Sequence, residues 1–93
     1  MTELGLKADN GKHRFSLLPK KTLRSVINVL EFSAKKYQPD NWQHVADAKT
    51  RYYDAACRHI DAWWHGEQTD PESGEHHLAH ATCCLLFLMY FEL

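Results

Sequence analysis

Apolar residues recur at intervals of three and four along residues 20–37. The stripe they form consists of Leu23, Val26, Ile27, Leu30, Ala34 and Tyr37. This spacing places the stripe on one face of an α-helix, so it predicts a helix from about Lys20 to Tyr37 with that face buried. Pro19 suits the first turn of such a helix. Pro39 ends it, because the residue before a proline avoids the α region.

A weaker apolar stripe predicts a second helix from about Val45 to His65. Its members are Ala48, Tyr52, Ala55, Ala56, Ile60 and Trp63. Gly66 is expected to end this helix, since glycine adopts the left-handed conformation of a helix C-terminus without a steric penalty. A third helix is predicted from about Glu75 to Phe91. The predicted fold class is therefore all-α: a small antiparallel bundle of three main helices.

The second half of the third helix, CCLLFLMYF at residues 83–91, is apolar nearly all round. A helix that is apolar on every side needs burial on every side. A chain of 93 residues cannot provide this by itself, so the pattern predicts a homo-oligomer with Leu85–Phe91 in the interface. A missing partner domain is the alternative explanation.

Residues 1–19 are predicted to form an N-terminal arm, followed by a helical domain at 20–93. The Asp9–Lys12 segment indicates a turn, because Asn and Gly tolerate positive φ. Phe15, Leu17 and Leu18 form a short apolar stretch that we expect to pack on the core. With a mass of 10.8 kDa, the chain is predicted to be one domain, 1–93.

The overall charge is close to neutral, with a formal net charge of -1, which argues against a general nucleic-acid binder. The charge is unevenly distributed, however: residues 1–51 carry +5 and residues 52–93 carry -6. No apolar run is long enough for a transmembrane helix, and the N-terminus lacks the apolar core of a signal peptide. Three cysteines, two of them adjacent, make a poor disulfide framework, so we expect a cytoplasmic protein.

Five of the seven histidines fall between His59 and His80, in the acidic half of the chain. His77 and His80 are three apart on the third helix, which places two imidazoles on one face. Glu67 and Asp70, in the preceding loop, supply the hard oxygen ligands that suit Mg²⁺ or Mn²⁺. An acidic surface loop and a solvated histidine pair are the alternatives. The cysteines form no CxxC pair, which argues against a zinc module.

Basic and aromatic residues meet at the end of the first helix. Lys35 and Lys36 could contact phosphates, and Asn41 and Trp42 close the following loop, where the tryptophan could stack on a base. A solvated lysine pair and a core tryptophan are the alternative interpretation of these residues.

Three segments resemble a known family: DNGKHRFSLLP, LEFSAKKYQPDNW and RYYDAACRHIDAWWHGEQTDPESGEHHLAHA. They are similar to the phage and bacterial dATP/dGTP diphosphohydrolase N-terminal domain family, which is related to the MazG-like all-α nucleotide pyrophosphohydrolases. The resemblance covers about residues 5–90. It implies a metal-dependent, oligomeric all-α enzyme that cleaves a (deoxy)nucleoside triphosphate to the monophosphate and pyrophosphate. A phage-encoded member would act in the host cytoplasm.

The chain departs from the MazG-like pattern of paired acids, EExxE on one helix and ExxD on another. Its first helix offers only Glu31, and its ExxD, formed by Glu67 and Asp70, falls in a predicted loop. The metal shell could therefore include histidines, be rebuilt, or be lost. Family resemblance alone does not establish activity.

The first functional hypothesis is an enzyme in which Mg²⁺ or Mn²⁺ is held by Glu31, Glu67, Asp70 and His80. In this hypothesis Lys35, Lys36 and Arg58 hold the phosphates, with Asn41 and Trp42 at the substrate. His59 or His77 transfers the proton, because imidazole titrates near neutral pH. The second hypothesis is a protein that sequesters nucleotides or binds a host protein without catalysis.

The histidines are expected to meet across one pocket. An antiparallel hairpin places the end of one helix beside the start of the next, so His59 and His80 lie at similar heights. The alternative is that these histidines only stabilise the hairpin through hydrogen bonds.

Overall fold

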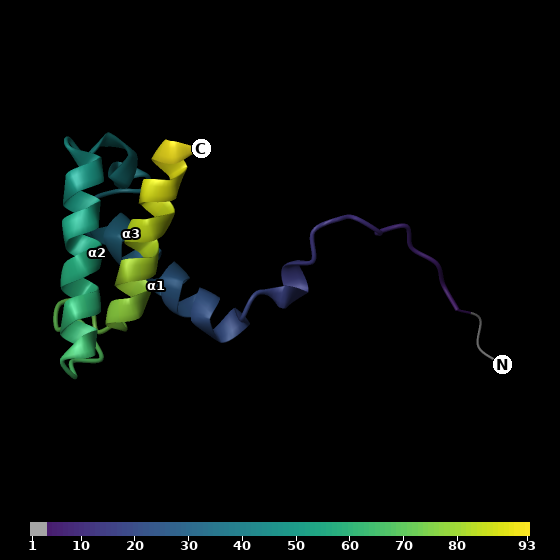
Figure 1. Ribbon diagram of the computed structural model, residues 1–93, viewed down its shortest axis with the longest axis horizontal. Coiled ribbons are helices and arrows are strands. Elements are labelled where there is room, and N and C mark those ends of the chain that lie inside the picture. Colours follow the sequence, from purple (N-terminus) through teal and green to yellow (C-terminus); the bar gives the residue numbers. More distant parts are fainter. Residues whose placement is uncertain (1–3) are drawn as a thin grey trace.

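The computed structural model describes residues 4–93, and its main elements are three α-helices (Figure 1). These are α1 (Lys20–Lys36), α2 (Ala48–Trp64) and α3 (His77–Glu92). Two short 3₁₀ helices, η1 (Phe15–Leu17) and η2 (Asn41–His44), precede α1 and α2. Residues 4–93 contain no named strand. The prediction of an all-α fold with three main helices is confirmed.

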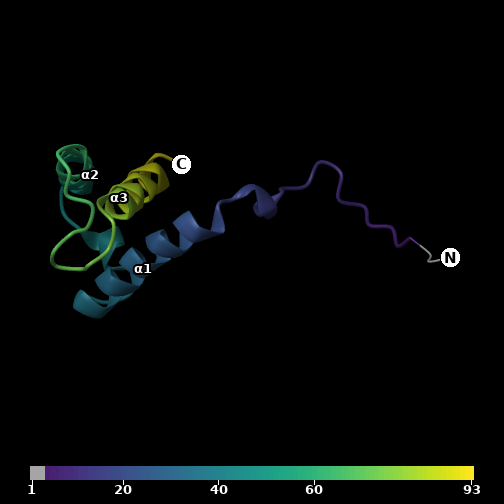
Figure 2. The ribbon, with the colours of Figure 1, turned by 90° about the horizontal axis from the view of Figure 1, so that it is seen from below.

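Helices α2 and α3 form an antiparallel hairpin and pack along their length, while α1 packs on α3 (Figures 1 and 2). Seen from below, α1 lies on one side of this hairpin, and the opposite side of the α2–α3 pair is uncovered (Figure 2). The N-terminal part of α1 projects beyond the hairpin and continues into the arm.

The core lies where α1, α3 and the α1–α2 connection meet. Its buried members are Val26, Val29, Ala79, Cys83 and Phe87, with Leu30, Trp42 and Tyr52 packed against them. The Trp42 ring stacks on Phe87 at a centroid distance of 4.5 Å, and Tyr52 meets Phe87 edge-on at 5.1 Å. The Tyr52 hydroxyl also donates to the Trp42 carbonyl at 3.2 Å. An aromatic group therefore ties the start of α2 to the end of α3.

The stripe predicted for the first helix is wrong in part. Val26 is buried, as is Val29 outside the predicted stripe, but Leu23 and Ile27 are about two-fifths exposed, and Tyr37 is more exposed still. The reason is that α1 makes its main packing contacts with α3 alone, so only a narrow face of it is covered. Periodicity identified the helix but overestimated the width of its buried face.

Two helix starts also differ from the prediction. The second helix begins at Ala48 rather than Val45, because Val45 is extended and Asp47 adopts a left-handed conformation with φ 53°. The third begins at His77 rather than Glu75, since the His76 side chain caps it by accepting from the Leu78 amide. Gly66 follows α2 with φ 102°, as the sequence predicts.

The packing predicted for the apolar stretch of the arm is wrong. Phe15 and Leu17 are 75% and 69% exposed, so this apolar stretch does not cover the core of its own chain. Within residues 4–93, no helix is long and apolar enough to cross a membrane.

The C-terminal half of α3 remains partly uncovered, with Leu85 and Met89 about half exposed. A single chain does not bury this helix on all sides, as its sequence indicated. The homo-oligomer itself stays a prediction.

Candidate functional site

The α2–α3 hairpin brings three histidines into contact. His59 on α2 lies with its Nδ1 2.8 Å from Nδ1 of His77, at the start of α3. The His59 ring also stacks on the ring of His80, with 4.5 Å between centroids and 11° between planes. Sequence reasoning placed His59 and His80 at similar heights, and the structure shows them side by side. Whether they act in catalysis remains a prediction.

The loop between α2 and α3 is held in shape by backbone hydrogen bonds. Asp70 N donates to the Glu75 carbonyl at 2.8 Å, and Gly74 N donates to the Asp70 carbonyl at 2.7 Å. Gly74 adopts φ +75°, a conformation that other residues rarely take. A backbone bridge between Thr69 and His76 closes the base of the loop. The carboxylates of the loop are therefore carried by a fixed backbone.

Glu67, His77 and His59 form a hydrogen-bonded chain. His77 Nε2 lies 2.6 Å from Glu67 Oε1, and an ionised carboxylate can only accept, so His77 donates from Nε2. In neutral His77 the other nitrogen, Nδ1, then accepts from His59 Nδ1. This order leaves Nε2 of neutral His59 as a lone-pair nitrogen. Because His77 is only 4% exposed, its orientation is fixed by packing as well.

Asp70, Ser73 and His80 form a second chain beside the first. Ser73 Oγ lies 3.2 Å from Asp70 Oδ2 and 2.6 Å from His80 Nε2. Since the carboxylate accepts, Ser73 donates to Asp70 and in turn accepts from His80. Both carboxylates thus orient a histidine, and we call these six residues the histidine–carboxylate cluster: His59, Glu67, Asp70, Ser73, His77 and His80.

The surroundings keep two of these imidazoles neutral near pH 7. Burial, reinforced by His80 and His77, lowers the pKa of His59 from 6.5 to about 4. Burial also lowers the pKa of His80. Burial pushes the pKa of Asp70 upward, but hydrogen bonds from Ser73 and the nearby imidazoles outweigh it and hold that pKa below its usual value. The cluster therefore pairs a charged Asp70 with neutral imidazoles.

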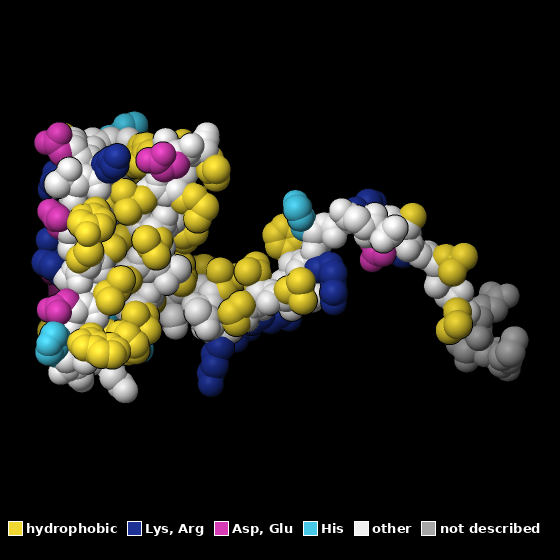
Figure 3. Space-filling view, viewed as in Figure 1, with side chains coloured by type: hydrophobic (Ala, Val, Ile, Leu, Met, Phe, Trp, Pro, Cys, Tyr) yellow, Lys and Arg dark blue, Asp and Glu magenta, His cyan; other side chains and the backbone are white. Residues whose placement is uncertain are grey.

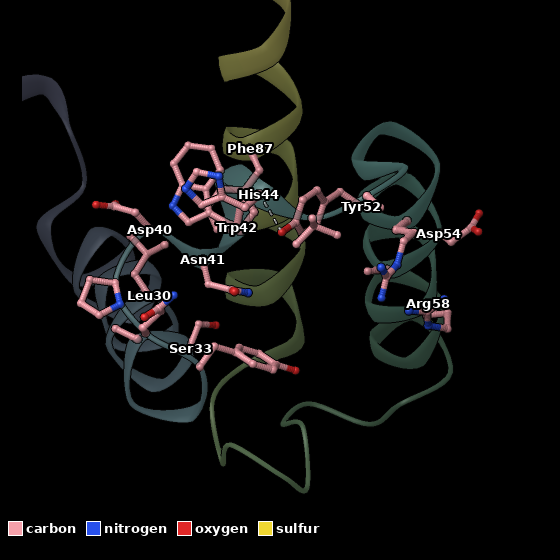
Figure 4. Close-up of a pocket in the computed structure, with 18 residues that line it drawn as sticks. Leu30, Ser33, Asp40, Asn41, Trp42, His44, Tyr52, Asp54, Arg58 and Phe87 are labelled. Carbon is pink, nitrogen blue, oxygen red and sulfur yellow. Dashed lines mark hydrogen bonds between the residues drawn. The ribbon is translucent and has the colours of Figure 1, made fainter.

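A cleft of about 880 Å³ opens between α1 and α2 (Figure 4). Leu30 and Ser33 line its α1 side, and Asp54 and Arg58 line its α2 side, while Phe87 of α3 lies at the back. Pockets of 300–1,000 Å³ are typical of small-molecule sites. The cleft is large enough for a nucleotide.

The lining of this cleft combines aromatic rings and cations. It includes Tyr37, Trp42 and Tyr52 together with the exposed guanidinium groups of Arg51 and Arg58. The two arginines are seven residues apart on α2 and so share a helix face. Phe87 covers one face of the Trp42 ring. Trp42 is therefore mainly a packing residue in the wall of the cleft.

Of the other site residues predicted from sequence, two line the cleft and two do not. Asn41 and Arg58 line the cleft. Lys35 is exposed on α1, and Lys36 instead pairs with Glu72 of the α2–α3 loop and lies 5.3 Å from the Tyr37 ring centre. Neither lysine is among the residues that line the cleft.

The predicted metal ligands do not form a ready-made cage. Across residues 4–93, no group of three or more His, Cys, Asp or Glu side chains is placed to hold a metal ion. Glu31 is exposed on α1, and the hydrogen bonds of Glu67 and Asp70 are made with His77 and Ser73 instead. Mg²⁺ commonly uses one or two protein carboxylates and completes its shell with phosphate oxygens and water. The carboxylates of this chain could therefore supply only some of the ligands of a divalent ion.

Sequence reasoning missed Ser73, Arg51 and Tyr52 as parts of these two sites. Arg51 was recognisable as seven residues before Arg58 on the same helix face. Ser73 carried no signal of its own, because a serine in a turn-rich loop most often serves that turn. Its position between Asp70 and His80 depends on the fold of the loop.

Comparison of the sequence with known proteins identifies a family and one relative. The model of the dATP/dGTP diphosphohydrolase, N-terminal, family matches residues 2–93. A relative from Salmonella phage PMBT28, named dATP/dGTP diphosphohydrolase, is 35% identical over 86 residues. That match covers 92% of this chain but only 29% of the relative. No solved structure matches the chain significantly.

Proposed function

Because the chain belongs to the dATP/dGTP diphosphohydrolase N-terminal family, we propose that it binds a deoxynucleoside triphosphate and hydrolyses it to the monophosphate and pyrophosphate. The observation that carries the proposal is the cleft between α1 and α2, which holds aromatic rings and two arginines, one of which, Arg58, directly precedes His59 of the histidine–carboxylate cluster. The phage relative bears the name of that activity.

In this proposal the cleft holds the substrate. Arg51 and Arg58 bind phosphate oxygens, since guanidinium groups match phosphate geometry with paired donors. The base and sugar lie toward Tyr37, Asn41 and Trp42, where aromatic edges and an amide are available. Arg58, which lines the cleft, immediately precedes His59 of the cluster on α2.

The cluster supplies proton transfer. The chain from Glu67 through His77 leaves Nε2 of His59 free to accept a proton from an attacking water. Glu67 and His77 hold His59 in the required tautomer, as a carboxylate does for a catalytic histidine. Asp70 and Ser73 hold His80 against the His59 ring in the same way.

The hydrolysis is proposed to depend on Mg²⁺ or Mn²⁺. Glu67 and Asp70 are the residues that would hold the ion, together with phosphate oxygens. A divalent ion bound there would supply neutralisation of phosphate charge and a lowered pKa for water.

The test measures binding and turnover separately. Purified chain is titrated with dATP and dGTP by calorimetry, and pyrophosphate release is followed with and without Mg²⁺ or Mn²⁺. His59→Gln should reduce pyrophosphate release at least ~100-fold while leaving nucleotide affinity within about twofold, because only proton transfer is removed. His65→Gln, which changes an exposed histidine near the end of α2, serves as the matched control.

Arg58→Gln tests the cleft. Loss of a charge-assisted contact should weaken nucleotide binding at least ~10-fold, since hydrogen bonds to charged groups contribute about 1.5–3 kcal/mol. Arg24→Gln, an exposed arginine on α1 outside the cleft, should bind like the unmodified chain. Equal affinities for the two variants would contradict the placement of the substrate in this cleft.

A nucleotide- or host-protein-binding protein without catalysis is the second candidate. It is favoured by one observation: residues 4–93 hold no group of three or more side chains placed for a metal ion. Nucleotide retention without pyrophosphate release, with every metal supplied, would identify this function instead.

A further inference from the structure

One face of the α2–α3 hairpin carries large apolar side chains that are between 36% and 74% exposed in the described chain. It lies on the side of the hairpin opposite α1, and its side chains gather over α2 and α3 in Figure 3. We call it the hairpin face and define it by Tyr53, Ile60, Trp63, Trp64, Leu78, Leu85 and Met89. On α3, Leu78, Leu85 and Met89 recur at helical spacing, so they form one exposed stripe.

The hairpin face is as large as a protein interface. If a large side chain offers about 200 Å², the exposed fractions of these residues amount to roughly 700 Å². Stable protein–protein interfaces bury about 800 Å² on each partner. A surface of this size and composition marks an interaction site.

The arm, residues 4–19, has the complementary composition. Its apolar residues Leu4, Leu6, Phe15 and Leu17 are all at least two-thirds exposed. Lys7, Lys12 and Arg14 alternate with them, and Lys20, Lys21 and Arg24 continue the positive charge into α1. The arm is therefore a basic segment with exposed apolar side chains, and these side chains do not pack on the core of the same chain.

The distribution of charge indicates that the hairpin face binds the arm rather than a second hairpin face. Residues 4–24 carry a net charge of +5, whereas residues 48–93, which contain the hairpin, carry -4. Two hairpins packed face to face would bring like charges together, which is unfavourable. An arm against a hairpin pairs opposite charges.

The direction of the arm favours a second copy over the same chain. The N-terminal half of α1 projects away from the hairpin, and α1 itself packs on the side opposite the hairpin face (Figures 1 and 2). Extended, the 16 residues of the arm reach about 50 Å, while the hairpin helices are about 25 Å long. The arm is long enough to run along the face of a neighbouring molecule.

We infer that the arm of one copy binds the hairpin face of a second copy, and that the exchange is reciprocal. Leu4, Leu6, Phe15 and Leu17 of each copy cover the apolar stripe of the other. The basic residues of the arm then lie near the acidic half of the partner chain. The pairing buries two apolar surfaces that the single chain leaves in water.

The test uses the full chain and three variants. The arm variant combines Phe15→Asp with Leu17→Asp, and the face variant is Leu85→Asp. Asn28→Asp, at an exposed position of α1, is the control for an added negative charge. Sedimentation velocity over a range of micromolar concentrations gives the oligomeric state, and circular dichroism confirms that each variant retains its helices.

The unmodified chain and the control should dimerise, and the arm and face variants should each dimerise at least ~10-fold more weakly. The two weakened variants, when mixed, should form a heterodimer, because the first supplies an intact face and the second an intact arm. A dimer that depends on Leu85 but tolerates the arm variant would overturn the inference in favour of face-to-face packing. A monomer at all concentrations would overturn it as well.

Discussion

Replacing His77 by leucine tests the network that orients His59. The substitution keeps the volume of a buried side chain but removes both of its hydrogen bonds, to Glu67 at 2.6 Å and to His59 at 2.8 Å. Glu67 is 54% exposed, so water can replace its lost partner. His59 Nδ1, in contrast, loses its acceptor in a half-buried position.

The expected cost follows from these two environments. Leaving a buried polar group unsatisfied costs about 1–3 kcal/mol, and a hydrogen bond that water replaces contributes about 1 kcal/mol or less. Together they predict a loss of about 2–3 kcal/mol in the free energy of unfolding. For a domain of this size the melting temperature should fall by roughly 10–20 °C.

The assay is chemical and thermal denaturation at pH 7 and at one fixed protein concentration, because self-association would make the melting temperature depend on concentration. His77→Gln is the matched variant, since an amide both donates and accepts and should restore at least half of the loss. A leucine variant within about 0.5 kcal/mol of the unmodified chain would refute the reasoning, because the two hydrogen bonds would then contribute nothing to stability.

Three further predictions follow from the same structure. Asp70→Asn keeps its shape but removes the charge, so divalent-metal affinity and any hydrolysis should fall at least ~10-fold; unchanged metal binding in calorimetry would leave Asp70 a structural loop residue. Folding lowers the pKa of His59 from 6.5 to about 4. Between these pH values His59 is therefore protonated in the unfolded chain but neutral in the folded chain. Stability should therefore be lost as pH drops from about 6.5 toward 4, and His59→Asn should flatten that dependence in denaturation curves measured over this range. Phe87→Ala removes the ring that stacks on Trp42 and should destabilise the chain by about 3–5 kcal/mol, measured by urea unfolding; a loss under 1 kcal/mol would show that this group is not the core.

The sequence predicted the helices well because their apolar spacing is a local property. It predicted the width of buried faces less well, since Leu23 and Ile27 fit the period but remain about two-fifths exposed. The prediction that Phe15 and Leu17 pack on the core was wrong for a related reason. Apolar character indicates that a side chain favours burial, but it does not say which surface covers it. Helix starts shifted because Asp47 and His76 shape the local backbone, which periodicity does not detect.

For the candidate site, the hairpin argument correctly brought His59 next to His80. It could not supply the order of hydrogen bonds, because that order depends on Ser73 and on how the loop backbone is closed. The cleft was also beyond prediction, since its walls come from α1, the α1–α2 connection and α2, and local periodicity does not give the relative placement of these elements.

The sparse attachment of α1 has a kinetic consequence. The α2–α3 hairpin joins neighbours in sequence, and such local contacts form fastest, whereas α1 must close a long segment to reach α3. The hairpin and its histidines can therefore assemble before α1 docks. Because α1 is held chiefly by a narrow strip around Val26 and Val29, its detachment should require less free energy than global unfolding. In that partly open state the histidine–carboxylate cluster persists but the cleft does not, so amide hydrogen exchange in α1 should slow when a ligand occupies the cleft.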